Sequence, residues 1–258
     1  MTSTPTSSPT VEPLRAAGAV AFSTLRGCAD PSGPYDGFSV CDYTSDAPAH
    51  IAACRDAVAD MLGLDSAESL ILPRQTHTAN VAIVDSSDAG RPLTAIDALV
   101  TADASVAIGV NTADCVPIVL SDKEAGVIAV VHSGWRGTVA RIAANAVDRM
   151  TSLGAAPENI VAAMGPSICA DCFEVGEEVA REFAQAFPDV DGVIVGGYAK
   201  PHVNLGAAIE ATLRECGVKA CNIYVPSRCS RCECHRFFSA RRLGVHSGRT
   251  LTVARLQR

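Results

Sequence analysis

The sequence predicts an α+β fold, a single mixed domain with central β-sheet layers flanked by helices. Short apolar runs rich in Val and Ile, such as 116–120 and 127–131, are bounded by polar residues and are typical of buried strands. Helical patterns are inserted between these runs without regular βαβ alternation, which disfavours a doubly wound sheet. With 258 residues, 48% of them hydrophobic, the chain is long enough to bury a substantial core.

The expected elements follow from these patterns in chain order. The first helix is predicted at 49–62, because Ile51, Val58 and Leu62 fall on one face and Gly63 provides a C-terminal stop. Thr138 is the expected N-cap of a helix that runs to residue 150, since its hydroxyl can accept a hydrogen bond from an otherwise unpaired amide. Further helices are expected at 174–187 and 205–216. Strands are expected at 17–24, 70–72, 81–84, 106–110, 116–120, 127–131, 160–164 and 223–225.

The start of the chain is rich in Ser, Thr and Pro, so we expect a disordered tail over 1–15 and a single domain over 16–258. The tail lacks the basic start and the apolar core of a signal peptide. No apolar stretch is long enough to cross a membrane without interruption. These features predict a cytoplasmic protein without a membrane partner, and they leave the oligomeric state open.

The charge pattern argues against nucleic acid as a partner, because the net charge is -7 and no run rich in Lys or Arg occurs. Basic residues do gather near the C-terminus. They could form an anion pocket, but a solvated basic face is the default expectation. These residues are Arg228, Arg231, Arg236, Arg241, Arg242 and Arg249.

Cys115 and His132 stand at the ends of adjoining apolar strands, and a glycine-bracketed turn with the only tryptophan follows His132. A thiol and an imidazole in this setting can hold a soft metal or act as nucleophile and base. A small core cysteine and a structural histidine are the plainer alternatives. The polar neighbours Asp114 and Arg136 favour a functional site, because polar groups beside buried strands are costly unless they face one.

Eleven cysteines is a high count for a chain without an export signal, so reduced thiols or metal ligands are expected instead of disulfides. Cys169 and Cys172 have a C-x-x-C spacing, and a second cluster contains Cys229, Cys232, Cys234 and His235. Each C-x-x-C could supply half of a structural zinc site. Nothing in the sequence requires the two segments to meet, so we expect reduced thiols that do not carry the chemistry.

Several common signatures are absent. The chain has no Walker-type phosphate loop, no G-x-S-x-G elbow and no H-x-E of the zinc nucleobase deaminases. Its six histidines include no H-x-H pair, and they are too few for several copper ions.

A series of motifs nevertheless resembles a known family, the purine nucleoside phosphorylases long labelled multicopper polyphenol oxidase or laccase-domain proteins. The resemblance begins near Arg26 and extends to the C-terminus. The motifs, in the family's order, are Arg74-Gln-Thr-His77, Asp97-Ala-Leu-Val-Thr101, Thr112-Ala-Asp-Cys-Val-Pro117, His132-Ser-Gly-Trp-Arg-Gly-Thr138, Gly165-Pro-Ser-Ile168, Phe173-Glu-Val-Gly176, Phe237-Phe-Ser-Ala-Arg-Arg242 and Gly248-Arg249.

The resemblance implies one zinc per chain, held by His77, Cys115 and His132, with copper as an adventitious substitute. It also implies a fold related to the catalytic domain of cytotoxic necrotizing factor. The implied substrates are phosphate and purine nucleosides, with phosphorolysis of adenosine, inosine, guanosine and S-methyl-5′-thioadenosine together with adenosine deaminase activity. The chain departs from the family at Ser39 and Cys54, where the family has Asn, at Asn204 for Asp and at Ser230 for Thr; Cys232 and Cys234 are extra thiols. Because Cys229 occupies the family's Cys-Thr position, the resemblance implies that it is buried beside the active site.

Roles for the surrounding residues follow from the chemistry of these reactions. Asp114 is the first candidate for proton transfer, or else an acceptor that holds a ligand imidazole. Gln75 would orient substrate or water, and Arg136 would bind phosphate near a helix N-terminus. Trp135 could stack on a purine or serve as a packing anchor. The further candidates for substrate contact are Arg26, Arg55 and Arg242.

Three function classes stay open from the sequence. The first is a zinc-dependent purine nucleoside enzyme. The second is a hydrolase that edits peptidoglycan precursors, with Cys115 as nucleophile and His132 as base. The third is an interaction protein in which zinc has a purely structural role.

Overall fold

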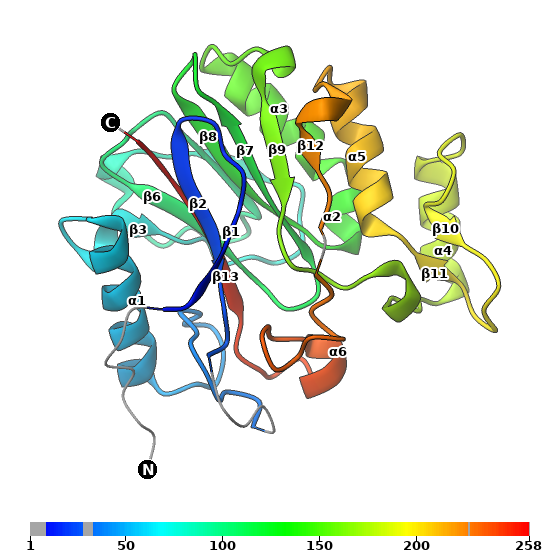
Figure 1. The fold of residues 1–258 in the computed structure, drawn as a ribbon, viewed down its shortest axis with the longest axis horizontal. Coiled ribbons are helices and arrows are strands. Elements are labelled where there is room, and N and C mark those ends of the chain that lie inside the picture. The colour runs from blue at the N-terminus through cyan, green and yellow to red at the C-terminus, as the bar shows by residue number, and fades with distance from the viewer. Residues whose placement is uncertain (1–8, 28–32, 227, 258) are drawn as a thin grey trace.

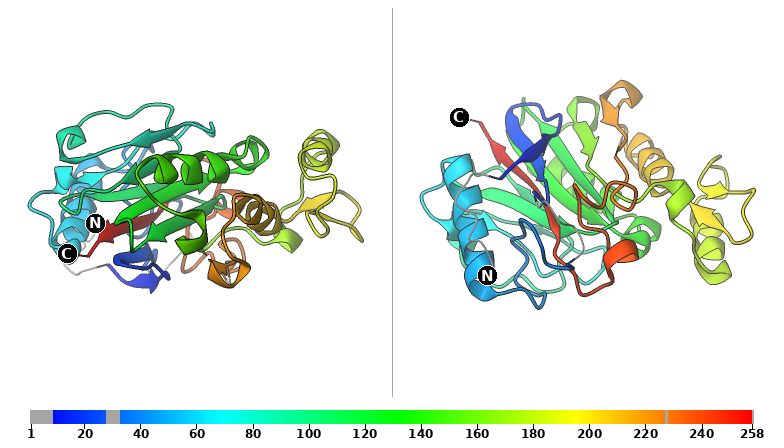
Figure 2. Two further views of the ribbon diagram at one scale, coloured as in Figure 1. Left: turned by 90° about the horizontal axis from the view of Figure 1, so that it is seen from above. Right: turned by 60° about the horizontal axis from the view of Figure 1, so that its bottom comes forward.

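The computed structural model describes residues 9–27, 33–226 and 228–257, which form two stacked β-sheets covered by helices (Figures 1 and 2). The six-stranded sheet has the order β12-β9-β7-β8-β5-β4, and the five-stranded sheet has the order β1-β2-β13-β6-β3. The predicted single α+β domain with layered sheets is confirmed.

The six-stranded sheet consists of β4 (Val81–Ile83), β5 (Ala98–Thr101), β7 (Val116–Asp122), β8 (Val127–Ser133), β9 (Val161–Met164) and β12 (Ile223–Tyr224). The five-stranded sheet consists of β1 (Val11–Pro13), β2 (Ala19–Thr24), β3 (Leu70–Ile71), β6 (Ala107–Thr112) and β13 (Thr250–Leu256). A separate two-stranded ribbon pairs β10 (Ile194–Val195) with β11 (His202–Val203).

The helices are α1 (Pro48–Leu62), α2 (Trp135–Val139), α3 (Ile142–Ser152), α4 (Glu177–Ala186), α5 (Leu205–Glu215) and α6 (Ala240–Leu243). Helix α1 covers the outer face of the five-stranded sheet, whereas α3 and α5 cover the outer face of the six-stranded sheet (Figure 2). Helix α4 and the β10–β11 ribbon project to one side of this stack (Figure 1).

Alternation along the strands explains the layers. On β7 and β8, Ile118 and Val131 face the core under α3 and α5, while Val119 and Val130 face the core between the two sheets. Successive side chains of a strand point to opposite faces, and both faces are covered, so these strands are apolar throughout. This burial explains why the chain has a mean hydropathy of +0.21.

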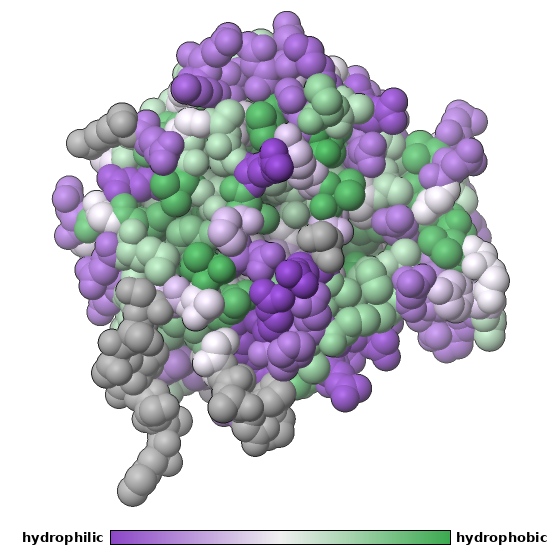
Figure 3. Space-filling model, in the orientation of Figure 1, coloured by the Kyte–Doolittle hydropathy of each residue, from purple (hydrophilic) through white to green (hydrophobic). Residues whose placement is uncertain are grey.

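The exterior has a different character. The space-filling view shows hydrophilic side chains crowded along the upper edge of the molecule, with hydrophobic ones in smaller groups across the middle (Figure 3). Within the described ranges, no helix is both long and apolar enough to span a membrane.

Most of the expected elements occur within a few residues of their predicted limits, and Gly63 ends α1 in the left-handed conformation with φ 63°. The expected helix at 174–187 is shorter, because α4 begins only at Glu177. Strand β1 lies within the stretch predicted to be a disordered tail, so that prediction is wrong for Val11–Pro13; residues 1–8 lie outside the described residues. Strands β5, β10, β11 and β13 and helix α6 were not expected.

The helix predicted to start at Thr138 is divided in two. Helix α2 begins at Trp135 with Gly134 as its N-cap, and α3 begins at Ile142 after Arg141, which has φ 61°. Thr138 therefore lies inside α2 and is not an N-cap. Its hydroxyl donates to the carbonyl oxygen of Gly134 at 2.9 Å and contacts the Ser133 hydroxyl.

Candidate metal centre

The centre lies at one end of the six-stranded sheet, where the β7–β8 hairpin opens. Val116 pairs with Ser133 in the antiparallel register. Cys115, the residue directly before β7, therefore lies beside His132, which is near the end of β8. The neighbouring β5 pairs with the other side of β8, and Ala98 is opposite Val131. Asp97 is therefore brought next to His132, and its carbonyl oxygen accepts from the His132 amide at 2.7 Å.

His77 reaches the same place from the loop before β4. Its backbone has φ 62°, a conformation that non-glycine residues seldom adopt. The Asp97 carboxylate holds this loop, because it accepts from the backbone amides of Thr76, His77 and Thr78 at 3.2, 2.9 and 2.8 Å and from the Thr78 hydroxyl at 2.7 Å. The turn around His77 is thus built on one buried carboxylate.

The side chains of His77, Cys115 and His132 converge, with one ligand atom from each lying within 4.8 Å of the others. His77 Nε2 is 3.8 Å from Cys115 Sγ, and the two imidazole rings meet edge to face with centroids 4.9 Å apart. His132 is buried, Cys115 is half-buried and His77 is exposed. Solvent therefore reaches the cluster at His77, whereas His132 lies in the protein interior.

Electrostatics favour charged groups in this cluster. Burial raises the pKa of Asp97, but hydrogen bonds from His132 and Thr78 outweigh it and lower that pKa to about 2. Burial also opposes ionisation of Cys115 and His132, yet their mutual attraction lowers the pKa of the thiol and raises the pKa of the imidazole. The Asp97 carboxylate adds to the second shift. The protein thus favours a Cys115 thiolate, the form that ligates metals.

The donor set fits a metal ion. Two imidazoles and one thiolate are ligands that zinc accepts, and three protein ligands with a free fourth position describe a catalytic zinc site rather than a closed structural one. His132 Nδ1 is 2.8 Å from Asp97 Oδ1, so the carboxylate accepts the Nδ1 proton and leaves the Nε2 lone pair for the metal. The sequence analysis missed this role of Asp97. It offered Asp114 first for proton transfer and otherwise as the imidazole acceptor, but the acceptor for the His132 ring is Asp97.

Gly134 leaves room for the ligands. A Cβ atom at this position would lie 2.8 Å from Cδ2 of His77 and 3.0 Å from Sγ of Cys115. The backbone of Gly134 has φ -75°, so the requirement for glycine is one of space and not of conformation.

Asp114 is next to Cys115 and has φ 86°. Its carboxylate accepts from the Ser230 hydroxyl at 2.7 Å and from the backbone amide of Arg241 at 2.6 Å, and its carbonyl oxygen accepts from the amide of Ile168 at 2.9 Å. Three separate segments therefore fix this residue. Its predicted part in proton transfer stays a prediction.

Gln75 is buried, and its amide pairs with the main chain of Asn111. Its Nε2 donates to the carbonyl oxygen of Asn111 at 2.8 Å, while Oε1 accepts from the Asn111 amide at 2.8 Å and from the Tyr43 hydroxyl at 3.1 Å. These bonds attach the loop before His77 to β6. Contact between Gln75 and substrate stays a prediction.

Trp135 and Arg136 begin α2, just beyond Gly134. Trp135 is half-buried against the core, and the Arg136 guanidinium lies over its ring at 4.2 Å from the centroid. Arg136 is exposed. Both residues follow His132 closely in the sequence. A purine that stacks on the same face of the Trp135 ring would have to displace the Arg136 guanidinium.

The three remaining predicted contacts are dispersed. Arg26 is 1% exposed, and its guanidinium donates to the carbonyl oxygens of Asp36 at 2.7 Å and Cys234 at 3.0 Å, so it supports the interior; its contact with substrate stays a prediction. Arg242 is exposed on α6. Arg55, on α1, forms an ion pair with Asp42 at 3.5 Å.

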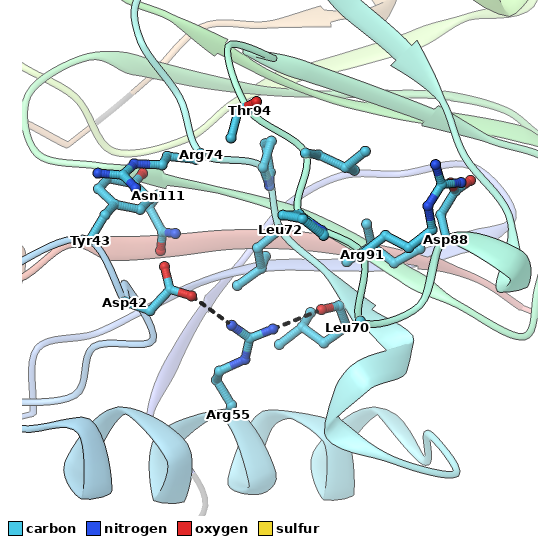
Figure 4. A pocket seen from close by; sticks show the side chains of 15 residues that line it. Asp42, Tyr43, Arg55, Leu70, Leu72, Arg74, Asp88, Arg91, Thr94 and Asn111 are labelled. Atoms are coloured by element: carbon cyan, nitrogen blue, oxygen red, sulfur yellow. Dashed lines mark hydrogen bonds and ion pairs between the residues drawn. The ribbon is translucent and has the colours of Figure 1, made fainter.

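Arg55 also lines a cavity of about 400 Å³ (Figure 4). Arg74 and Arg91 contribute two further cations to its wall, and Asn111 closes it beside Tyr43. The Oδ1 atom of Asn111 is buried and has no hydrogen-bond partner within the described residues. None of the three clustered ligands belongs to the lining, so this cavity is separate from the candidate metal centre.

Comparisons with known proteins agree with this picture. A family model described as multi-copper polyphenol oxidoreductase laccase matches residues 19–257. The chain is 48% identical to adenosine deaminase RL5 from an unknown prokaryotic organism, over 91% of this chain and 93% of that protein. It is 39% identical to a purine nucleoside phosphorylase of Deinococcus radiodurans, over 92% of this chain and 89% of that protein. The crystal structure of YlmD from Geobacillus stearothermophilus has a TM-score of 0.87 at 29% identity and covers 94% of this chain and 93% of its own.

Proposed function

Because the chain belongs to the family described as multi-copper polyphenol oxidoreductase laccase, whose relatives carry the names of purine nucleoside enzymes, we propose that it is a zinc-dependent enzyme of that kind. It would catalyse phosphorolysis of adenosine, inosine, guanosine and S-methyl-5′-thioadenosine, and it would deaminate adenosine. The convergence of His77, Cys115 and His132 on one point, open to solvent at His77, is the observation that carries the proposal.

Zinc is preferred to several coppers because of the ligands that the fold provides. The described residues contain two clusters of metal-ligating side chains, and the only imidazoles in them belong to His77 and His132. Oxidase centres with several coppers need more imidazole ligands than this. We therefore propose one zinc at the three-ligand centre, with copper as an adventitious substitute and phenol oxidation as a side activity at most.

The metal would supply Lewis acidity that activates water for attack on C6 of adenosine. The protein's own part is to position the ligands: Asp97 fixes the His132 tautomer and at the same time holds the turn that presents His77. Asp114 is the proposed proton acceptor, because its carboxylate is fixed one residue from Cys115. The Ser230 hydroxyl and the Arg241 amide that bind it would hold it in position.

Phosphorolysis also needs a cationic place for phosphate. Arg136 is exposed at the first turn of α2, directly beyond the centre, and Arg242 is exposed on α6, where the Arg241 amide already contacts Asp114. We propose these two guanidinium groups as the phosphate contacts and the Trp135 ring as the surface on which the purine stacks. Arg55 stays a proposed substrate contact, although the cavity that it lines is separate from the candidate metal centre.

The test measures turnover of adenosine with and without phosphate, together with zinc content. Adenine formation that requires phosphate reports phosphorolysis, and inosine formation without phosphate reports deamination. We expect His132→Ala to lose both activities and the zinc of this centre. The matched control is His246→Ala, an exposed histidine outside the cluster, which should retain both. Full zinc occupancy of this centre in Cys115→Ala would overturn the proposal.

One observation favours a second candidate, a cysteine-centred hydrolase that acts on peptidoglycan precursors. Cys115, His132 and Asp97 form a thiol, imidazole and carboxylate series of the kind that activates nucleophilic cysteines. The two candidates differ in the state of the thiol. A zinc-bound Cys115 resists iodoacetamide until a chelator is added, whereas a nucleophilic Cys115 in the active enzyme reacts at once and activity is lost.

Two further expectations from the sequence, one drawn from its N-terminus and apolar stretches and one from the resemblance, stay proposals. We propose a cytoplasmic location and a fold related to the catalytic domain of cytotoxic necrotizing factor. The second can be tested by superposing the β7–β8 hairpin and its Cys115–His132 pair on that domain. If the sheets superpose but no Cys and His occupy equivalent positions, the two proteins share the fold and not the site.

A further inference from the structure

Four cysteines from two distant segments meet beside the candidate metal centre. Cys169 and Cys172 form one C-x-x-C pair and Cys229 and Cys232 the other, and the four sulfur atoms all lie within 4.8 Å of one another. We propose that these residues, the thiol cluster hereafter, form a second metal site that binds zinc through four thiolates. This proposal does not depend on the function proposed for the His77 centre.

The distances between the sulfur atoms fit four ligands around a single metal ion. Zinc–sulfur bonds of about 2.3 Å in a tetrahedron separate the sulfur atoms by about 3.8 Å. The Sγ atoms of Cys172 and Cys232 are 3.5 Å apart, close to that separation. A disulfide would require about 2.05 Å, and all four residues are free thiols in the structure. An iron–sulfur cluster would force the sulfur atoms further apart, because its own core lies between them.

The backbone is arranged to bring the two pairs together. Ser167 and Cys229 form a parallel bridge, in which the Ser230 amide donates to the carbonyl oxygen of Ser167 at 3.0 Å. On one side, a single 3₁₀ turn over Ala170–Cys172 places two sulfur atoms on the same side of the loop. This arrangement corrects the expectation that the two segments need not meet. It draws two ligand pairs from separate segments, as closed zinc sites usually do.

Two of the sulfur atoms, those of Cys229 and Cys172, accept hydrogen bonds from neighbouring donors. The amide of Cys169 donates to Sγ of Cys229 at 3.3 Å, and Nη1 of Arg231 donates to Sγ of Cys172 at 3.3 Å. A nearby cation and N–H···S bonds stabilise a sulfur anion, and a metal site is completed by such outer contacts. Cys234 and His235, which the sequence placed in the same cluster, do not belong to the group of four.

The thiol cluster also supports the other centre. Ser230 lies between Cys229 and Cys232, and its hydroxyl binds the Asp114 carboxylate at 2.7 Å. On the opposite segment, the amide of Ile168, next to Cys169, donates to the Asp114 carbonyl oxygen at 2.9 Å. A metal that joins the two segments would therefore clamp Asp114 from both sides.

The first test counts zinc in the full chain purified under reducing conditions. We expect about two zinc equivalents per chain, one from each centre. The double variant Cys172→Ser/Cys232→Ser should keep about one, and His77→Ala/His132→Ala should keep the other, so that failure of either proposal is distinguishable. Cys221→Ser, which removes an exposed thiol outside the cluster, should keep both. An unchanged zinc count in Cys172→Ser/Cys232→Ser would overturn the inference.

A second test needs no substitution and remains informative if that variant does not fold. The native protein is alkylated with and without a chelator, and the labelled cysteines are located by mass spectrometry. We expect Cys169, Cys172, Cys229 and Cys232 to be protected until zinc is removed. Cys221 should react in both samples. Equal labelling of Cys232 before and after chelation, or a disulfide within the cluster of the freshly reduced protein, would refute the site.

Discussion

Asp97 shows how much one buried side chain can organise. Its carboxylate receives five hydrogen-bond donors, from Thr76, His77, both groups of Thr78 and the His132 ring. One of these donors belongs to a residue with positive φ, His77. Such a backbone conformation costs free energy and persists where its surroundings impose it. Asp97 therefore connects the strained turn to His132 at the end of β8.

This arrangement predicts a specific pH dependence of stability. The pKa of Asp97 falls from 3.8 to about 2 on folding, because hydrogen bonds from His132 and Thr78 outweigh the opposing effect of burial. A lowered pKa in the folded state stabilises the fold above the unfolded value, and this contribution, about 2 kcal/mol, is lost as the pH falls towards the folded value. The free energy of unfolding attributable to Asp97 should therefore decrease between pH 4 and pH 2.

The measurement compares urea unfolding of metal-free wild type and Asp97→Asn at several pH values in this range. We expect the difference in free energy of unfolding to be largest at pH 5 and to shrink as the pH approaches 2. Asp60→Asn is the matched control, since this carboxylate is exposed on α1. A difference between wild type and Asp97→Asn that does not vary with pH would contradict the linkage.

At the scale of elements, the sequence predicts what local pattern determines. The apolar runs give β7 and β8, and the strand register then brings Cys115 and His132 together. Two features escape such reasoning. The Asp97 role depends on the pairing of β5 with β8, and the thiol cluster depends on the bridge between Ser167 and Cys229. Both are contacts between distant segments, which neither periodicity nor motif spacing reports.

The loop between Cys229 and α6 provides a test at the same scale. Replacing Ser230 with Ala removes the hydroxyl that donates to the Asp114 carboxylate at 2.7 Å. Hydrogen bonds to charged groups contribute about 1.5–3 kcal/mol, and Asp114 also has the costly φ of 86°. We expect Ser230→Ala to lower the free energy of unfolding by about 1–3 kcal/mol and to reduce turnover of adenosine.

Urea unfolding and steady-state kinetics measure these two effects, and zinc content serves as a further readout. Ser152→Ala is the control, because this exposed hydroxyl donates to the carbonyl oxygen of Arg149 in the same helix and binds no other segment among the described residues. The control should change stability by no more than about 0.5 kcal/mol. Wild-type stability and turnover in Ser230→Ala would show that the contact with Asp114 has no consequence.

The whole molecule depends on contacts between the two ends of the chain. Strand β13 lies between β2 and β6 in the five-stranded sheet and is antiparallel to both. The sheet therefore joins residues near the N-terminus to residues near the C-terminus (Figure 1). Neither the core between the sheets nor the core under α1 can close before this last strand is in place, because β13 contributes Ala254 to the first and Val253 to the second.

This topology predicts that the last strand is indispensable to the candidate metal centre, although it contributes none of the three clustered side chains. Deleting residues 250–258 removes Leu251, Val253 and Leu256, all buried, and each such side chain contributes about 1.5–3 kcal/mol. The sum approaches the whole stability of an ordinary domain, about 5–15 kcal/mol. We expect the shortened chain to lose cooperative unfolding and the zinc at His77, although all three ligands remain. Deleting only residues 257 and 258, beyond the end of β13, should leave cooperative unfolding and zinc binding intact.

Circular dichroism during thermal unfolding and zinc analysis decide between these outcomes. A cooperative transition at the wild-type temperature in the shortened chain would mean that the two sheets close without β13.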